Sequence, residues 1–415
     1  MINQKIIVRQ TAKRVNEMIQ RSIELYPAYK LYITALRNQL FLSVSITEKD
    51  ADPEKTTEEI YRRIAEVLVA SSSQIIHERC FAKVDLRQQI QKARVRALGK
   101  HQIQVNTPGT FVEGESCFEN TIAGFQIRAL KPATGTTIRT IIDDGIPKGR
   151  SWNINGSIFY MLQSIDGGAT NGAEPSDRKV QSEAMFRQAE RLLRAQGFTF
   201  QDVIRTWIYI SDILDWYDDF NVVRNHCYSE YGFINTPDTH KPAEQIYLPA
   251  STGIEGKNSF GRAATMDLFA VHRSLASAMK VRPIHSPKQL SPFRYGSAFS
   301  RAVVIEDAES KLIFVSGTAS IDEDGKSVFI GDPARQMQQT FHVMSDLIAP
   351  EGAQLKDICE ATVFLKRRQD FSLSQEIITQ GGISNAPSIS VVADVCRDEL
   401  LFEIDAAFIL EKHTA

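Results

Sequence analysis

The sequence predicts an α+β protein built from three tandem copies of one βαβ unit. Three observations lead to this fold class. The chain has 415 residues, and at roughly 150 residues per domain this length corresponds to two or three domains. A residue pattern in the middle third recurs in the last third, and a fainter copy with the same order opens the chain. Such internal self-similarity is typical of a repeated structural unit.

The two clearer copies are related by an offset of about 155 residues. The strand patterns at 158–166 and 313–322 align Ser164 with Ser320 and Asp166 with Asp322. The same offset aligns a longer series: Gln181 with Gln336, Phe186 with Phe341, Leu192 with Leu347, Gly197 with Gly352, Asp202 with Asp357 and Asp215 with Asp370. An ordered series of this length indicates a duplication.

Within the last copy the elements follow one another in a fixed order. After the first strand, apolar residues fall on one face of a helix: Met337, Phe341, Met344, Leu347 and Ile348. Gly352 is placed to end that helix. The β-branched segment 358–365 then predicts a buried strand, and 400–410 predicts a closing strand.

The first copy is fainter but its elements keep this order. Its first strand is expected at 40–46, its helix at 60–68, its second strand at 80–86 and its closing strand at 121–130. Proline cannot extend a strand ladder, so the Lys131-Pro132 dipeptide marks the first boundary. The second falls in the 276–283 connection. The predicted domains are 1–131, which is degenerate, 132–276 and 277–415.

Composition excludes several classes of protein. Lys and Arg number 48 against 50 Asp and Glu, so the net charge of -2 favours neither a nucleic-acid partner nor a membrane surface. The five cysteines form no CxxC pair and predict reduced thiols, a cytoplasmic location and no metal site. No signal peptide or membrane span is recognised, and without GxxxxGK[ST] or GxGxxG motifs no nucleotide cofactor is expected.

These segments resemble the Rid (YjgF-like) superfamily. The resemblance rests on the series Ser316–Asp322, Gly352, Asp357, Thr362–Leu365 and Asp370-Phe371, and it covers nearly the whole chain in triplicate. Within the superfamily the chain is most similar to the chorismatases, through four segments: 249–254, 295–301, 316–322 and 393–397, the last leading to Glu403-Ile404-Asp405.

The resemblance implies three Rid-like (chorismate-mutase-like) domains that form a pseudo-trimer within one chain, with ligand clefts between adjacent units. It implies a cofactor-free enzyme that releases pyruvate and a hydroxybenzoate from chorismate. It also implies that Glu403 is the proton donor. Cys396 is similar to the residue of the subgroup that releases 3-hydroxybenzoate, where it would line the ring pocket and assist proton movement during aromatisation.

The chemistry of a vinyl ether agrees with this role for Glu403. Cleavage requires protonation of the terminal methylene, and a carboxylic acid can donate near neutral pH only if burial keeps it protonated. Glu403 stands in an otherwise apolar strand, on the same face as Leu401 and Asp405. The alignment places Thr265 at its position in the second copy and Gln126 in the first, which predicts one working cleft per chain.

Chorismate carries two carboxylates, for which arginine forks are suitable partners. The candidates are Arg301, Arg397 and Arg262. Hydroxyl groups that could bind ring oxygens or water are those of Tyr295, Thr318 and Ser320, although each of these is also suited to local backbone hydrogen bonds.

Two other functions stay open from sequence alone. One is an imine or enamine deaminase like the smaller Rid enzymes, which hold the substrate carboxylate with an arginine in a Pro-Ala-Arg-Ser type segment. The matching segments here lack that arginine: 107–110, 248–251 and 385–388. The other is a non-catalytic metabolite-binding protein. The assembly expected is a monomeric pseudo-trimer or a higher homo-oligomer.

Overall fold

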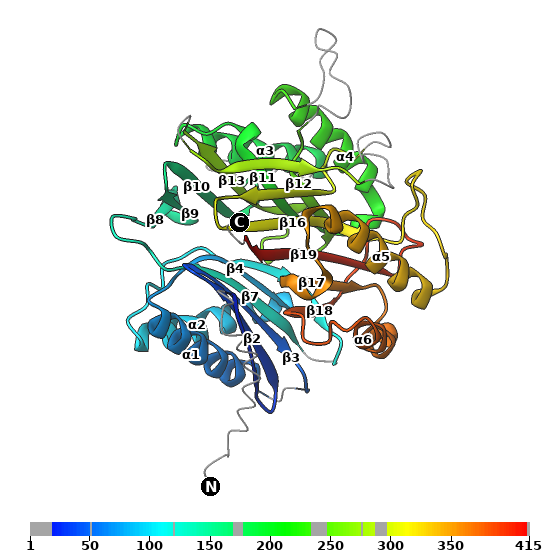
Figure 1. Ribbon diagram of the computed structural model, residues 1–415, viewed down its shortest axis with the longest axis horizontal. Helices are drawn as coiled ribbons and strands as arrows, with labels where there is room; N and C mark the ends of the chain where they lie inside the picture. Colours follow the sequence, from blue (N-terminus) through cyan, green and yellow to red (C-terminus); the bar gives the residue numbers. More distant parts are fainter. Residues whose placement is uncertain are drawn as a thin grey trace.

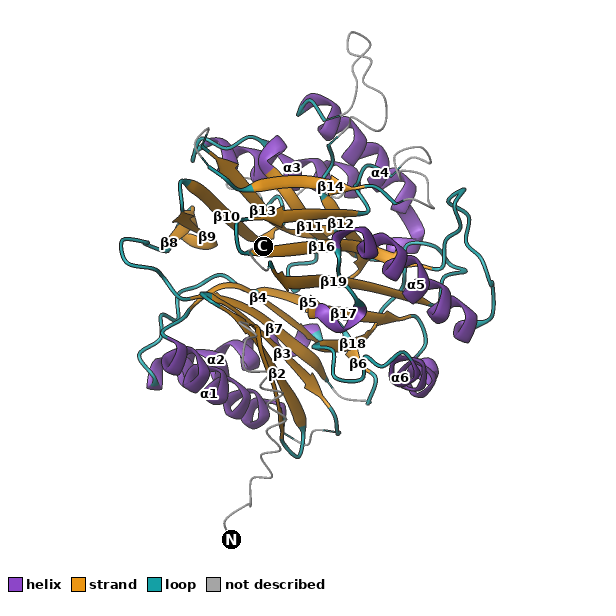
Figure 2. Cartoon of the chain, viewed as in Figure 1, coloured by secondary structure: helices purple, strands orange, loops and turns teal. Residues whose placement is uncertain are grey.

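The computed structural model describes residues 19–49, 52–118, 121–168, 177–233, 247–274, 277–286 and 297–412. These residues form three mixed β-sheets arranged around a common centre (Figure 1). The long helices lie on the outside of the sheets, and the strands face inward (Figure 2). The predicted α+β class with three related units is confirmed. No helix in the described ranges is long and apolar enough to cross a bilayer.

The first sheet has the strand order β1-β2-β3-β7-β4-β5. Its strands are β1 (Ile19–Leu25), β2 (Tyr29–Leu36), β3 (Gln39–Ile46), β4 (Gln74–Ala82), β5 (Thr110–Glu113) and β7 (Ile122–Leu130). Its helices are α1 (Pro53–Ser71), α2 (Arg87–Lys100) and the short 3-10 helix η1 (Val84–Leu86).

The second sheet has the order β12-β11-β13-β10-β9-β8. Its strands are β8 (Arg139–Asp143), β9 (Ile146–Ile154), β10 (Ser157–Ile165), β11 (Val203–Ile210), β12 (Ala250–Glu255) and β13 (Ala264–Arg273). Its helices are α3 (Arg178–Arg194), α4 (Ile213–Glu230) and η2 (Phe200–Asp202).

The third sheet has the order β14-β15-β16-β19-β17-β18-β6. Its strands are β14 (Lys280–Ile284), β15 (Ala302–Glu306), β16 (Ser310–Ala319), β17 (Ile358–Leu365), β18 (Ser388–Val392) and β19 (Phe402–Glu411). Its helices are α5 (Pro333–Ile348), α6 (Phe371–Gln380), η5 (Ala349–Glu351), η6 (Leu355–Asp357) and η7 (Arg368–Asp370).

One strand crosses between units. β6 (Glu115–Ser116) precedes β7 in the chain, yet it pairs with β18 at the edge of the third sheet. The first and last units are thereby joined directly. The division at 131/132 falls between β7 and β8, whereas Ala276 lies outside the described residues. The domain boundaries therefore stay a proposal, with β6 shared across them.

Local sequence signals explain where the long helices begin. Asp52 and Asp332 each accept a backbone N–H of the first helical turn, from Lys55 at 3.1 Å and Arg335 at 3.0 Å. Each is followed by a proline at the first helical position, where no backbone donor is needed. These two helices consequently start with the same kind of cap.

The helical part of the predicted duplication is visible in equivalent contacts. The Gln181 side chain accepts the backbone N–H of Ala263 at 2.8 Å, and that of Gln336 accepts the N–H of Leu401 at 2.8 Å. Both glutamines thus tie the helix to the start of the closing strand. Two further pairs also correspond: Gly197 and Gly352, with φ of 79° and 78°, and Asp202 and Asp357, which both close capping boxes.

The predicted strand register is wrong by a few residues. Both β10 and β16 carry a two-residue bulge before their last residues, at 163–164 and 316–317. Ile165 after the first bulge pairs with Met266, and Thr318 after the second pairs with Ile404. Ser164 is therefore the counterpart of Gly317, not of Ser320. Bulges and unequal loops change the offset, and no composition pattern marks them.

The same ladders correct one of the two residues aligned with Glu403. In each unit the strand beside the closing strand, β4, β11 or β17, has a bulge near its start. The residue six positions after the last pair that precedes this bulge is therefore equivalent in the three units, and it pairs with a residue of the closing strand. Those residue pairs are Phe364 with Glu403, Tyr209 with Thr265 and Phe81 with Gly124. Thr265 is confirmed as the counterpart in the second unit. In the first unit the counterpart is Gly124, because Gln126 corresponds to Asp405.

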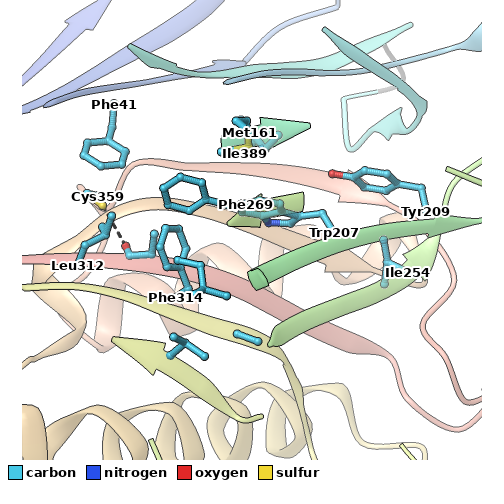
Figure 3. Close-up of a cluster of buried hydrophobic side chains, with 14 of the residues drawn as sticks. Phe41, Met161, Trp207, Tyr209, Ile254, Phe269, Leu312, Phe314, Cys359 and Ile389 are labelled. Carbon is cyan, nitrogen blue, oxygen red and sulfur yellow. Dashed lines mark hydrogen bonds between the residues drawn. The ribbon is translucent and has the colours of Figure 1, made fainter. Parts of the chain in front are cut away.

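A large apolar cluster lies where the three sheets meet, with side chains from every unit. Figure 3 shows Phe41 of β3, Trp207 of β11 and Phe314 of β16 among them. The rings of Trp207 and Phe314 lie 6.2 Å apart in an edge-on contact. Each unit also has its own core between sheet and helices. The units are thus packed together by a shared apolar centre.

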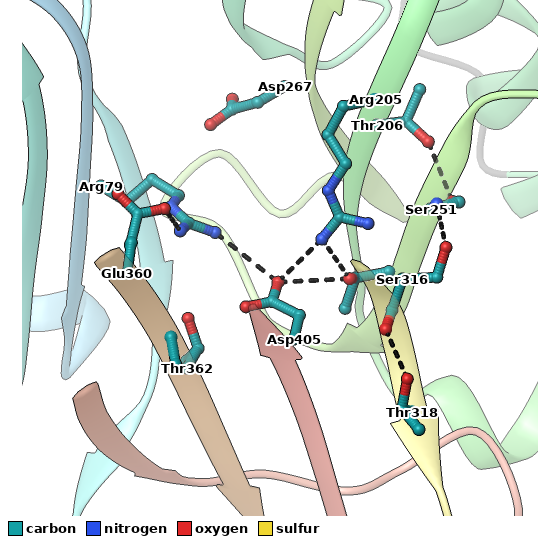
Figure 4. A network of polar contacts seen from close by, with 12 residues as sticks. Arg79, Arg205, Thr206, Ser251, Asp267, Ser316, Thr318, Glu360, Thr362 and Asp405 are labelled. Atoms are coloured by element: carbon teal, nitrogen blue, oxygen red, sulfur yellow. Dashed lines mark hydrogen bonds and ion pairs between the residues drawn. The ribbon is translucent and has the colours of Figure 1, made fainter. Parts of the chain in front are cut away.

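Buried ion pairs cross the same centre (Figure 4). Glu360 of β17 accepts from Arg79 of β4 and Arg128 of β7, each at 2.7 Å. Arg205 of β11 donates to Asp405 of β19 at 3.1 Å. Because breaking one partner of a buried pair leaves an uncompensated charge, this network fixes how the units are seated.

Candidate active site

A narrow cavity lies between the second and third units. Its walls combine residues of α4 and β12 with the bulge of β16 and the start of β19. Four of the residues predicted from the sequence line it: Glu403, Cys396, Arg301 and Arg397. The sequence therefore identified four of the ten wall residues that the third unit provides.

Glu403 is the buried acid of this cavity, with only 4 % of its surface exposed. Burial raises the pKa of its carboxyl from the usual 4.5 to about 8, and the negative charge of nearby Asp405 adds to the rise. Arg205 acts in the opposite direction but does not cancel the effect. A carboxyl with a pKa of about 8 is roughly 90 % protonated at pH 7, so Glu403 can donate a proton.

Gly317 allows the Glu403 carboxyl to occupy its place. A Cβ atom at position 317 would lie 2.1 Å from Oε1 of Glu403, far inside contact distance. The bulge of β16 brings this glycine over the second residue of β19. Any side chain at position 317 would displace the acid.

Two buried guanidinium groups face the same cavity, Arg224 from α4 and Arg301 from the segment before β15. The Cζ of Arg224 lies 5.9 Å, and that of Arg301 6.0 Å, from the centre of the Phe299 ring. Arg224 is 1 % exposed and donates to Asn221 at 2.6 Å, and no described carboxylate forms an ion pair with it. A buried positive charge of this kind favours an anionic ligand.

Cys396 and Arg397 complete the wall contributed by the last unit. Burial raises the pKa of the Cys396 thiol to about 12, and the Glu403 charge acts in the same direction. The thiol is therefore protonated, which fits a wall residue and not a nucleophile. Arg397 is half-buried and donates to the carbonyl oxygen of Gly325 at 2.8 Å.

The other predicted residues are placed elsewhere. Arg262 does not reach this cavity, because it lies beside a second cavity between the first and second units. Thr318 donates to the Ser316 carbonyl at 2.8 Å and Ser320 to the Val328 carbonyl at 3.0 Å, so both hydroxyls serve the local backbone. Tyr295 lies outside the described residues.

Sequence reasoning missed Arg224 as a wall residue, and it named Gly317 and Ser251 only within the segments 316–322 and 249–254 that carry the family resemblance. A signal for Arg224 was present, because it falls on the apolar stripe of α4 with Phe220, Val223 and Cys227. An arginine on a buried stripe calls for an explanation. For Gly317 and Ser251 the signal is only the family segment, since the bulge of β16 and the packing of two units decide which side chains face the cavity.

The larger cavity between the first and second units has about 990 Å³, against about 50 Å³ for this one. Size alone favours the larger cavity as a ligand site. The chemistry favours the smaller one, where a protonated carboxylic acid lies next to buried guanidinium groups. We therefore treat the cavity of Glu403 as the candidate active site.

Comparisons with known proteins identify relatives of this chain. Residues 294–409 match the family described as Endoribonuclease L-PSP. A chorismatase of Streptomyces hygroscopicus is 25 % identical over 288 residues, covering 64 % of this chain and 75 % of that protein. A 3-hydroxybenzoate synthase of the same organism is 26 % identical over 233 residues, covering 51 % of this chain and 64 % of that protein.

A solved chorismatase structure superposes with a TM-score of 0.58 at 19 % identity, covering 91 % of this chain and 99 % of that one. The likeness extends over all three units. The chain therefore has the fold of that chorismatase and is a sequence relative of chorismatases.

Proposed function

We propose that this chain, a relative of chorismatases, cleaves the enolpyruvyl ether of chorismate into pyruvate and a hydroxybenzoate, with 3-hydroxybenzoate favoured. The observation that carries the proposal is the buried, protonated carboxyl of Glu403 in a cavity that also holds Arg224 and Arg301. The names of two relatives, a chorismatase and a 3-hydroxybenzoate synthase, support the same activity.

Glu403 acts as general acid. Its proton adds to the terminal methylene of the vinyl ether, which leaves an oxocarbenium-like carbon that an oxygen nucleophile attacks. The carbon–oxygen bond to the enolpyruvyl carbon then breaks and pyruvate leaves. Chorismate has the composition of pyruvate plus a hydroxybenzoate, so the net reaction consumes no water. One water is taken up when the ether is cleaved, and one is released when the ring loses a hydroxyl group and becomes aromatic. Glu403 is reprotonated from solvent between turnovers.

The two carboxylates of chorismate match the two buried guanidinium groups. Arginine binds a carboxylate through two parallel hydrogen bonds, and such pairs are strongest where water is excluded. At about 50 Å³ the cavity is smaller than the roughly 300–1,000 Å³ typical of ligand sites, so binding requires side chains at its rim to move. Arg397 and Ser297 are lining residues whose side chains are partly exposed.

The alternative functions receive less support. At the position where the deaminases carry their anchoring arginine, this cavity has Ser251, whose hydroxyl accepts from Thr206 at 2.8 Å. A non-catalytic binding protein has no need for a carboxyl whose pKa is raised to about 8 next to the ligand.

The test is incubation of the purified chain with chorismate, with chromatography of pyruvate and aromatic products. We expect both to form in equal amounts, and Glu403→Gln to lower kcat by about 10²–10⁴-fold, because the amide cannot donate the proton. Cys396→Ala should change the product distribution more than the rate of chorismate loss. No turnover by the unsubstituted chain would contradict the proposal, and full activity of Glu403→Gln would remove the mechanism.

The cytoplasmic location and the assembly state stay predictions. The shared apolar centre and the strand β6 already join the three units within one chain. We therefore expect a monomeric pseudo-trimer as the smallest functional form, which sedimentation of the purified chain would measure directly.

A further inference from the structure

We propose that the cavity between the first and second units is a second ligand site, which binds a small cyclic carboxylate without transforming it. This inference goes beyond the proposed activity, because the site is separate from the cavity of Glu403. It rests on the cavity itself, on its structural correspondence with the active cavity, and on the charges in its wall.

The two cavities correspond position by position. The strand ladders relate the second unit to the third by offsets of 153 residues in β9–β10 and 138 residues around β13. Applied to the residues that line both cavities, these offsets give the following pairs: Ile146 with Phe299, Lys148 with Arg301, Ser164 with Gly317, Asp166 with Ala319, Gly168 with Ile321 and Arg262 with Leu400. The larger cavity is therefore the counterpart of the active one.

The correspondence preserves a cationic anchor and removes the acid. Lys148 takes the place of Arg301, and Arg262 adds a second cation where the active cavity has Leu400. Thr265 takes the place of Glu403, so no carboxylic acid stands where the proton donor would be. The site can bind an anion but cannot protonate it there.

At the third interface, the position that corresponds to Glu403 is filled by packing between the first and third units. At Gly124, the counterpart of Glu403 in the first unit, an added Cβ would lie 2.3 Å from the Val44 carbonyl oxygen and 2.8 Å from the Ile389 side chain. β18, which carries Ile389, packs against β3 and β7 there. The opening between the first two units is therefore not a general consequence of the repeat.

Charges in the wall favour an anion. Three of the acids are already paired, since Glu78 binds Arg94 at 2.6 Å, Asp143 binds Arg191 at 2.8 Å and Asp166 lies 3.6 Å from Lys148. The wall carries five cations, Arg87, Lys92, Arg94, Lys148 and Arg262, against four acids, and one of these acids, Asp143, is paired with Arg191 outside the wall. The excess of positive charge fits a ligand with one or two carboxylates.

Arg87 is the cation best placed to receive that ligand. Its guanidinium lies 4.4 Å from the centre of the Phe260 ring, and no carboxylate of the described residues forms an ion pair with it. Burial lowers its pKa, which an anionic partner would reverse. Phe260 is 54 % exposed and Ile146 is 57 % exposed at the same cavity. Apolar faces beside a guanidinium suit a flat ring that carries a carboxylate.

Calorimetric titration with benzoate tests this site, and benzamide serves as the neutral control. The full chain carrying Arg301→Met is used, so that the active cavity has lost one of its anchors. We expect saturable binding of benzoate with Kd at or below about 1 mM, and none of benzamide. Arg87→Met and Lys148→Met should each weaken benzoate at least about tenfold, because both keep the aliphatic stem and remove the charge.

Arg96→Met is the matched control, since Arg96 lies on the same helix but pairs outward with Glu54 and Glu58. It should leave the Kd unchanged. The proposal is overturned if benzoate does not bind the Arg301→Met chain, or if Arg87→Met and Arg96→Met bind it equally. Turnover of chorismate is not measured, so these outcomes are independent of the proposed activity.

Discussion

Replacing Gly317 by alanine is the most direct test of how the acid is positioned. The added Cβ would lie 2.1 Å from Oε1 of Glu403, whereas ordinary contact begins near 3.4 Å. The carboxyl must therefore move by about 1.3 Å, the difference between these distances. A misplacement of about 1 Å in a catalytic group costs on the order of 10² in rate, so kcat on chorismate should fall about 100-fold.

Stability should change much less than activity. The atom in the way is the end of a side chain, and the next contacts of the new Cβ are 3.0 Å and 3.3 Å away. Glu403 can turn aside at small cost, so we expect a loss of no more than about 1–2 kcal/mol in the free energy of unfolding.

The assay measures pyruvate release with chorismate in excess, beside a thermal melt of each protein. Gly253→Ala is the matched control in the same cavity, because its Cβ would meet Tyr217 at 3.4 Å, an ordinary contact. It should keep kcat within a few-fold of the unsubstituted chain. The reasoning is refuted if Gly317→Ala is as active as Gly253→Ala.

Three further predictions follow from charges and pKa values. Because the protonated form of Glu403 is the reactive one, kcat should be constant below about pH 7 and fall as pH rises through about 8, which a pH–rate profile would show. Arg224→Met should raise KM at least about tenfold while the melting temperature is kept or increased, since it removes a buried charge without a carboxylate partner. Glu360→Ala should cost about 3–5 kcal/mol in chemical denaturation, because Arg79 and Arg128 lose their shared partner. The Glu360 pKa is lowered to about 2, so its stabilising contribution should be present above about pH 4.5 and decline as pH falls toward 2.

The helical part of the fold was predictable because its signals are local. Asp52-Pro53 and Asp332-Pro333 are start signals that lie beside the helices they begin. Gln181 and Gln336 align at one offset with the residues that follow them because both lie within their helices. The strands were aligned less well. The bulge that places Gly317 over Glu403 depends on pairing with a strand about 86 residues later, which local patterns do not contain.

The candidate site was predictable where one short segment of the chain carries it. Glu403 and Cys396 are close in the chain and stand in a recognisable segment. Arg224 and Ser251 come from the neighbouring unit, so their place depends on how two units pack. Arg262 opens the closing strand of the second copy, and the sequence predicts it as a further carboxylate anchor of the same site. The structure shows the limit of that reasoning, since equivalent positions line equivalent cavities, not one shared cavity.

The joining of three related units in one chain has a consequence for how such a protein can change. In a ring of identical subunits, every substitution is repeated at each interface, so a useful residue at one place must be tolerated at all of them. Here Glu403, Thr265 and Gly124 are encoded separately, and each interface can adopt its own composition. A costly buried acid is needed at one interface only, while a neighbouring interface is free to acquire a different ligand.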